Sequence, residues 1–273
     1  SIVREQLMEM IEKRISDASI LRLLRKWINV GVIDEGRLLV SETGTGQGQI
    51  ISPLLANVYL HHVLDQWFED EVKPRLKGQA FAIRYADDGL LCFQHQEDAD
   101  KVMAVLPKRF AKFGLTLHPE KTRLVKFGRS ALARAELDGT KPETFDFLGF
   151  THQCARSRQG KFTVHVKTMK KRLRRSLKAV AEWCRRHRHD DVAEQHRTLD
   201  AKMRGHYQYY GRPTNYRRLW QFYRSVRGIW KKWLNRRTRG RTLTWERYAQ
   251  LLHRHPLARP RITRPWSGTA SPT

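Results

Sequence analysis

Two adjacent carboxylates, Asp87 and Asp88, lie between two short hydrophobic segments, 81–85 and 90–93, whose composition is typical of β-strands. This pattern predicts a hairpin that closes in an Asp-Gly turn and carries both carboxylates at its tip. Neighbouring carboxylates repel each other, and a divalent cation bound between them relieves the repulsion. The pair therefore indicates a metal site. An Asp-Asp dipeptide considered by itself, however, more often belongs to an ordinary solvent-exposed turn.

Several helices must surround and position this hairpin. Apolar periodicity predicts helices over 3–15, 17–30 and 98–113, and a long helix from Ser52 that ends before Pro74. The buried face of the long helix is predicted to consist of Leu55, Tyr59, Val63 and Trp67. We further expect a strand over 38–40, strand-like segments over 115–117 and 122–125, a surface loop over 130–144, and a second hairpin from 145–150 and 162–166.

Positive charge is concentrated in the second half of the 273-residue chain. Residues 1–150 hold 21 basic and 21 acidic side chains, whereas residues 151–273 hold 32 and 6, so the second half carries the whole net charge of +26. A surface of this kind favours a polyanionic partner, because neutralising phosphates releases their counterions. Nucleic acid is the favoured partner, and no membrane partner is expected, because no run approaches about 18 apolar residues.

The basic half is predicted to be helical. Its periodicity indicates helices over 169–187, 190–205 and 215–236, followed by a disordered, basic and Pro-rich tail over 256–273. The aromatic residues of the last long helix are expected to lie in the core rather than to form a base-stacking surface; they include Trp220, Tyr223, Trp230 and Trp233.

Five segments in the chain resemble motifs of reverse transcriptases encoded by group II introns, and they occur in the same order. Residues 85–88 (YADD) resemble the catalytic box, and residues 44–60 resemble the GTPQGG-x-x-SPLLAN-x-YL segment. Residues 113–122 resemble the next palm motif, and residues 147–150 (FLGF) resemble the primer-grip box. Residues 199–210 are similar to the L-x-x-K-x-R-G-W-x-x-Y-Y stretch of the maturase domain, which also serves as the polymerase thumb.

The resemblance implies an α+β fold and an RNA-directed DNA polymerase that also acts as a maturase in intron splicing and mobility. A reverse-transcriptase palm, with a small antiparallel sheet and packed helices, would occupy residues 1–155, lacking the fingers and the first catalytic-Asp motif. A basic helical thumb and maturase domain would occupy 156–255, and the disordered tail 256–273. Asp87 and Asp88 would be the catalytic residues and would bind two Mg²⁺ ions.

The resemblance also implies roles for further residues. Gln47, Gly48, Tyr85 and Lys121 would contact nucleotide and template, and Leu148 and Gly149 would form the primer grip. The residues expected to bind RNA are Lys170, Lys171, Arg172, Arg174, Arg175, Lys202, Arg204, Lys231, Lys232, Arg236 and Arg237. The implied partners are group II intron RNA, an RNA template with a DNA primer, and deoxynucleotide triphosphates; a homodimer is left open. The implied location is the bacterial cytoplasm, in association with nucleic acid.

Two departures from the family pattern matter most. Gly46 stands where the family usually has Pro, and Gln49 stands where it has Gly. The family's third catalytic carboxylate would precede the helix near Ile2, and Asp17, the nearest candidate, is predicted to be an N-cap instead. We therefore expect that residues are missing upstream and that these 273 residues alone are nearly inactive. A non-catalytic RNA-binding splicing factor and a decayed reading frame are the alternatives.

Overall fold

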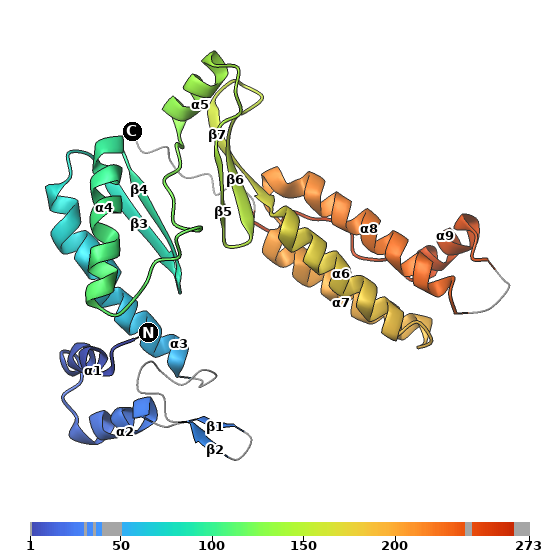
Figure 1. The fold of residues 1–273 in the computed structure, drawn as a ribbon. Coiled ribbons are helices and arrows are strands. Elements are labelled where there is room, and N and C mark those ends of the chain that lie inside the picture. Colours follow the sequence, from blue (N-terminus) through green and yellow to red (C-terminus); the bar gives the residue numbers. More distant parts are fainter. Residues whose placement is uncertain (1, 30–31, 35–36, 40–50, 238–241, 265–273) are drawn as a thin grey trace. The chain divides into compact units, whose positions relative to one another are not determined.

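The computed structural model describes residues 2–29, 32–34, 37–39, 51–237 and 242–264. The fold is α+β, with small antiparallel sheets among many helices, as predicted (Figure 1). The chain divides into two compact units, Ser1–Leu124 and Val125–Thr273. The carboxylate pair belongs to the first unit, and the basic helices belong to the second.

The first unit combines helices with two two-stranded sheets, β1–β2 and β3–β4. Its elements before the long helix are α1 (Arg4–Glu12), α2 (Ala18–Asn29), β1 (Val32–Asp34) and β2 (Arg37–Leu39). The long helix is a succession of α3 (Ser52–Leu60), the π-helical segments η1 (His61–Gln66) and η2 (Phe68–Val72), and the 3₁₀ turn η3 (Lys73–Arg75). The unit ends with β3 (Ala80–Tyr85), β4 (Asp88–Phe93) and α4 (Gln96–Lys112).

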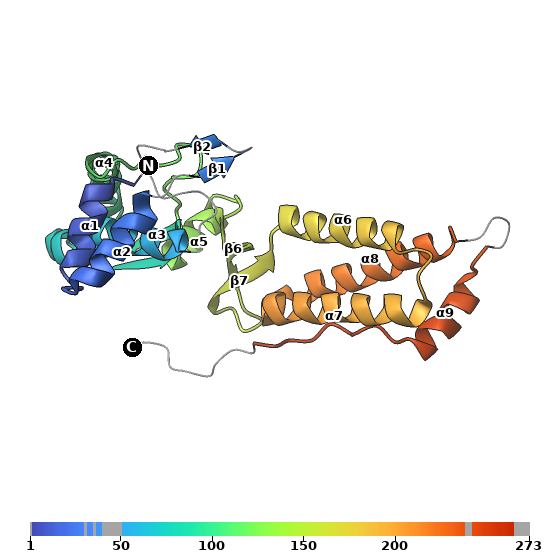
Figure 2. The ribbon, with the colours of Figure 1, turned by 90° about the horizontal axis from the view of Figure 1, so that it is seen from below.

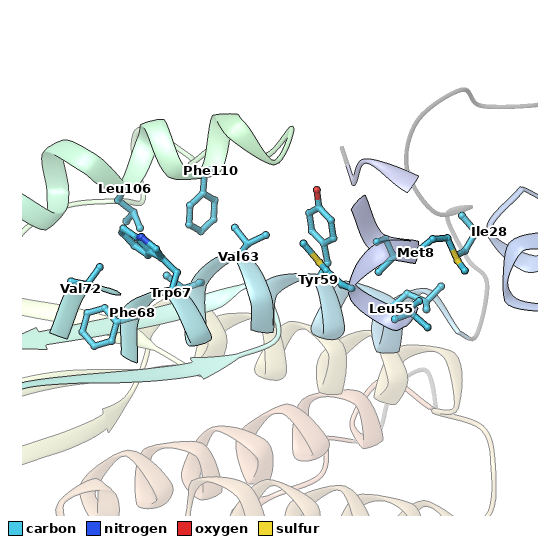
Figure 3. Packing of buried hydrophobic residues seen from close by; sticks show 14 of the residues in the cluster. Met8, Ile28, Leu55, Tyr59, Val63, Trp67, Phe68, Val72, Leu106 and Phe110 are labelled. Carbon is cyan, nitrogen blue, oxygen red and sulfur yellow. The ribbon is translucent and has the colours of Figure 1, made fainter. Parts of the chain in front are cut away.

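The core of the first unit forms along the long helix. The four predicted residues of its buried face, Leu55, Tyr59, Val63 and Trp67, are all at most 6% exposed, which confirms the prediction. Side chains of α4 and of the N-terminal helices pack against this face (Figure 3). Asp17 caps α2 as predicted, because its Oδ1 accepts hydrogen bonds from the backbone N–H groups of residues 19 and 20 at 2.8 and 3.0 Å. The long helix therefore provides the buried surface against which β3 and β4 pack.

The second unit joins a three-stranded antiparallel sheet of order β5–β6–β7 to a group of helices. The first elements are α5 (Arg129–Leu137), β5 (Thr144–Phe147), β6 (Phe150–Arg156) and β7 (Phe162–Thr168). The helices are α6 (Lys170–Arg186), α7 (Val192–Tyr210), the 3₁₀ turn η4 (Pro213–Asn215), α8 (Tyr216–Leu234) and α9 (Trp245–Arg254). Within this unit, α6, α7 and α8 run side by side, and α9 lies at their end distant from the sheet (Figures 1 and 2).

The helical core is built from apolar stripes on α6, α7 and α8. Trp230 is fully buried, and its indole Nε1 donates a hydrogen bond to Gln195 Oε1 at 3.0 Å. The expectation that all four aromatic residues of α8 are core is correct for Trp230 but only partly for Trp220, Tyr223 and Trp233, which keep part of their surface in solvent. The helix therefore offers aromatic surface as well as positive charge.

Four local predictions are wrong. The second hairpin is not formed by 145–150 and 162–166, because the chain turns at 148–149 and residues 162–168 pair with the intervening strand 150–156. Segments 115–117 and 122–125 are not strands: Leu115 and Leu117 pack on the core of the first unit without joining a sheet. The expected loop over 130–144 contains α5, which forms because Leu132 and Ala135 give it a buried side. The helix expected to end near residue 205 continues to Tyr210, since Tyr207 extends its buried face. The alternation of apolar residues and the polarity of a segment therefore do not predict its secondary structure where packing against other elements determines it.

The tail is not disordered over residues 256–264, which corrects the prediction. Leu257 is 4% exposed and joins the helical core. The backbone N–H of Ala258 donates to Asp200 Oδ1 at 2.6 Å, and that of Thr263 donates to the Gly211 carbonyl at 3.0 Å. These contacts hold the segment along α7 despite its prolines (Figure 2). Residues 265–273 of the predicted tail lie outside the described residues.

Candidate functional site

The carboxylate pair lies at the closed end of the β3–β4 hairpin. Tyr85 pairs with Asp88 and Arg84 pairs with Gly89, so the turn consists of Ala86 and Asp87. The predicted Asp-Gly turn is therefore wrong, because Gly89 belongs to β4 and the positive φ of 51° falls on Ala86. A single positive φ at the first turn residue is the pattern of a type II′ hairpin. Asp87 and Asp88 are both exposed at this tip.

The guanidinium group of Arg84 links the turn to the long helix through hydrogen bonds. Its Nε and Nη2 donate to the two carboxylate oxygens of Asp65 at 2.7 and 2.6 Å. Its Nη1 donates to Asn57 Oδ1 at 2.8 Å and to the carbonyl of Ala86 at 3.1 Å. The hydrogen bonds with Asp65, and then the charges of Asp65 and Asp87, raise the pKa of Arg84 above its ordinary value. A permanent positive charge is thus fixed beside the carboxylate pair.

Asp65 is presented by the π-helical segment η1. The side chain of Arg109 on α4 donates to the carbonyls of Val63 and His62 at 3.1 and 3.4 Å, and it lies over the ring of Phe113 at 4.6 Å. π-Helical turns are rare in proteins, and those that occur are often found at functional sites. Arg109 therefore supports the part of the long helix that delivers Asp65 to Arg84.

Sequence reasoning missed Arg84, Asp65 and Asn57. The available signal was the charge of Arg84 in the otherwise apolar segment 81–85, because a half-buried Arg in such a strand needs an acidic partner. Nothing in the local pattern identifies that partner, since Asp65 lies 19 residues earlier on another element.

Asp87 and Asp88 provide two oxygen donors of the kind that Mg²⁺ prefers. The residues fit such an ion as part of a ligand set, and no group of three or more His, Cys, Asp or Glu side chains suited to a metal occurs within the described residues. Tyr85, beside the pair, is 67% exposed. Lys121 is exposed in a turn whose backbone bonds to His118. Gln47 and Gly48 lie outside the described residues, so the roles expected of these four residues stay predictions.

The predicted primer-grip residues form the turn of the β5–β6 hairpin. Phe147 pairs with Phe150, which leaves Leu148 and Gly149 in the turn with φ angles of 46° and 78°. The hydroxyl of Tyr209 donates to the carbonyl of Leu148 at 2.9 Å, and the ring of Tyr209 stacks on Phe150 at 5.7 Å.

Gly149 is closely approached by Tyr210. A Cβ atom at position 149 would lie 3.2 Å from the Tyr210 hydroxyl. The substituted residue would also have to adopt the positive φ of Gly149, which side chains disfavour. The turn and the 199–210 stretch, which sequence analysis identified as separate motifs, are therefore brought into contact within the second unit.

Comparison with protein families decides the family of the chain. Residues 2–152 match the family model described as "Reverse transcriptase (RNA-dependent DNA polymerase)", which is more than half of the chain. The chain belongs to this reverse transcriptase family. The match includes both the YADD turn and the FLGF turn.

Individual relatives of the chain include intron-encoded proteins. An "Uncharacterized 91 kDa protein in cob intron" of Schizosaccharomyces pombe is 40% identical over 70 residues, 26% of this chain and 9% of that protein. "Protein YkfC" of Escherichia coli K12 is 40% identical over 74 residues, which cover 27% and 18%. "Group II intron-encoded protein LtrA" of Lactococcus lactis subsp. cremoris is 37% identical over 57 residues, which cover 21% and 10%. The matched segments thus span less than a fifth of these relatives.

The residues predicted to bind RNA fall into two groups. On α6, the five residues Lys170, Lys171, Arg172, Arg174 and Arg175 are exposed. The others make defined contacts: Lys202 lies over Trp183, Arg204 pairs with Asp200, Lys231 lies over Trp245, Lys232 and Arg236 lie over Trp233, and Arg237 donates to the carbonyls of His189 and Asp190. The five α6 residues differ in that none of them has a salt bridge or a ring contact within the part of the chain that the structure describes. None of the described helices meets the length and apolarity needed to cross a bilayer.

His206 occupies the position at which the maturase pattern has Trp, and its side chain packs there through the faces of its ring. Its imidazole stacks on Phe222 at 3.7 Å between centroids and contacts Tyr210 at 4.6 Å. Burial lowers the pKa of His206 from 6.5 to about 4, because the charged form loses its hydration. The ring is therefore neutral at pH 7 and supports Tyr210 as an aromatic side chain would.

Proposed function

We propose that this chain supplies the palm and thumb of an RNA-directed DNA polymerase encoded by a group II intron, and that the same protein serves as the maturase of that intron. Residues 1–155 would form the palm and residues 156–255 the thumb and maturase domain. The observation that carries the proposal is the tip of the β3–β4 hairpin. There, two adjacent carboxylates are exposed beside a turn whose Ala86 carbonyl is bonded to Arg84, in a chain of the reverse transcriptase family. The intron-encoded relatives support the link to introns.

The proposed reaction joins the 3′-hydroxyl of a primer to the α-phosphate of a deoxynucleotide. Asp87 and Asp88 would hold Mg²⁺, which, when bound, stabilises charge on the attacking and leaving oxygens. Arg84 would keep the two carboxylates in one orientation, because it fixes the turn carbonyl between them and β3. Gln47, Gly48, Tyr85 and Lys121 would contact template and nucleotide, and the backbone of Leu148 and Gly149 would contact the primer.

The exposed positive side chains of the second unit would bind the phosphates of structured RNA. The proposed partners are group II intron RNA and an RNA template with a DNA primer, with deoxynucleotide triphosphates as substrates. The five exposed cations along α6 support this assignment most directly, since they lie on one helix and face solvent.

The test is primer extension on an RNA template with Mg²⁺ by the complete protein that contains this chain. Asp87→Ala should lower the rate by about a thousandfold or more, because charge stabilisation at a metal site is worth several kcal/mol. Asp100→Ala, which removes an exposed carboxylate of α4, is the matched control and should retain full activity. Undiminished synthesis by Asp87→Ala would refute the catalytic assignment. RNA binding without synthesis by the unchanged protein would instead indicate a non-catalytic splicing factor.

A further inference from the structure

The second unit contains a cavity of about 650 Å³ that no predicted site includes. It lies where β7 meets η4 and the first turns of α8, at the sheet end of the helices (Figure 1). Its walls include four cationic side chains and two aromatic rings, namely Lys167, Arg217, Arg218, Arg224, Tyr216 and Trp220. The volume falls within the roughly 300–1,000 Å³ typical of sites for small molecules.

The junction beneath the cavity is firmly connected. Thr214 Oγ1 accepts a hydrogen bond from the Val166 N–H at 2.9 Å and donates one to the Val166 carbonyl at 3.0 Å. The fully buried Asn215 accepts from the Thr168 N–H at 2.8 Å and donates to Thr168 Oγ1 at 2.7 Å. The floor of the cavity is therefore formed before any ligand arrives, so binding requires little ordering of the backbone.

The charge of the cavity favours an anion. Among the described residues, no Asp or Glu lines it. Lys167 and Arg218 donate to the neutral amide oxygens of Gln153 and Gln221, at 3.2 and 2.7 Å, so these contacts leave the positive charges uncompensated. Arg217 and Arg224 are exposed at the cavity and lie about two turns apart on the same side of α8. Arginine side chains in such positions suit phosphate groups, which they bind through paired N–H donors.

The aromatic rings favour an anion that also has a flat ring. Tyr216 is 43% exposed and meets Trp220 edge to face, with centroids 6.2 Å apart. Trp220 is in turn held edge to face by Tyr223 at 5.3 Å, outside the cavity lining. Proteins bind unpaired RNA bases by stacking them on aromatic side chains, whereas the faces of paired bases are covered by their neighbours in the helix.

We propose that this cavity binds an unpaired nucleotide of RNA. The base would stack on Tyr216 or Trp220, and the flanking phosphates would contact Arg217 and Arg224. This inference rests on the proposed RNA binding of the second unit and adds a preference to it: the chain selects RNA with an unpaired nucleotide over continuous duplex. The exposed cations of α6 would not produce such a preference, because they contact phosphates, which paired and unpaired nucleotides share.

The test compares two RNA hairpins that differ at one position. One carries a single bulged 2-aminopurine, and in the other the same 2-aminopurine is paired with uridine. The whole chain should bind the bulged hairpin roughly tenfold more tightly, because stacking on an aromatic side chain is worth about 1–3 kcal/mol per base. The fluorescence of the 2-aminopurine should change on binding only in the bulged hairpin.

Matched variants locate the effect. Tyr216→Ala should abolish the tenfold preference, whereas Tyr216→Phe, which keeps the ring, should retain it. Arg217→Ala should weaken binding of the bulged hairpin more than Arg158→Ala, which removes the same charge from the exposed β6–β7 turn. Thermal unfolding of each variant checks that the helices remain folded.

The outcomes separate the cavity from the proposed function. Equal affinity for both hairpins, or a preference that survives Tyr216→Ala, would overturn the cavity assignment and leave general RNA binding intact. Failure of the unchanged chain to bind either hairpin would overturn both. Binding of poly-glutamate that depends on Tyr216, in place of the bulged hairpin, would assign the cavity to an acidic peptide and overturn the proposal for RNA.

Discussion

The two units each contain a hairpin that closes in a two-residue turn, and in both turns the first residue has a positive φ although it is not glycine. The φ angle is 51° at Ala86 and 46° at Leu148. The supports differ. A guanidinium group, Arg84, donates to the carbonyl of Ala86, whereas a phenolic hydroxyl, Tyr209, donates to the carbonyl of Leu148.

The difference follows the side chains that each turn presents. The first turn carries the carboxylate of Asp87 and is followed directly by Asp88 on β4, and the fixed positive charge of Arg84 beside them lowers the repulsion between the two carboxylates. The second turn carries no charged side chain, and neutral rings support it through a hydrogen bond and stacking. Two-residue hairpin turns can thus serve two kinds of site, with a side chain from another part of the sequence supporting each turn.

Removal of the charged support should have the largest effect on stability. Arg84→Met leaves Asp65 without its guanidinium partner in a site where the two side chains are 14% and 30% exposed. The free energy of unfolding should fall by about 3–4 kcal/mol, measured by urea unfolding. Arg25→Met, which breaks the more exposed pair with Glu12, is the matched control and should cost less than about 1 kcal/mol. Equal losses in the two variants would show that Arg84 is an ordinary surface residue.

Acid should weaken the aromatic support while leaving the guanidinium charged. The pKa of His206 is about 4 in the folded chain and 6.5 when unperturbed, so the folded state favours the neutral ring. Its contribution is complete above about pH 6.5 and is lost progressively as the pH falls toward 4, by about 2–3 kcal/mol in the free energy of unfolding. His206→Phe should lack this part of the pH dependence. Identical pH profiles for the two proteins would contradict the assignment.

The hydroxyl of Tyr209 should contribute the smallest effect. Tyr209→Phe removes the hydrogen bond to Leu148 but keeps the ring on Phe150, so the free energy of unfolding should fall by about 0.5–1 kcal/mol. Tyr209→Leu removes the stacking as well and should lower it by about 1 kcal/mol more. If both variants lost the same amount, the ring would have no role in supporting the turn.

Periodic features of the fold could be predicted from the sequence. The buried face of the long helix and the cap of α2 at Asp17 were correct because both depend on residues no more than four positions apart. The π-helical segment was not predicted, since apolar spacing over two turns does not distinguish bonds to residue i+4 from bonds to i+5. The position of Asp87 and Asp88 at a hairpin tip was correct, but the turn residues were not, because pairing across β3 and β4 decides which residues remain outside the ladder.

Long-range contacts account for most of what could not be predicted. Arg84 and Asp65 are recognisable as partners only once the hairpin lies against the long helix. The prolines of 256–264 indicated disorder, and the buried Leu257 shows that a segment of this composition is ordered when another helix offers it donors and acceptors. Trp220 was expected in the core, but the cavity beside it depends on where β7 meets α8.

The segment that returns along α7 also sets an order of events during synthesis. The hydrogen bond to Asp200 cannot form until Ala258 has been added to the chain, 58 residues later. At a translation rate of about 5–20 residues per second, that interval is about 3–12 s. During this time the side of α7 that will meet Leu257 is exposed on the nascent chain, and the helical unit acquires its last core contact only when this segment has left the ribosome.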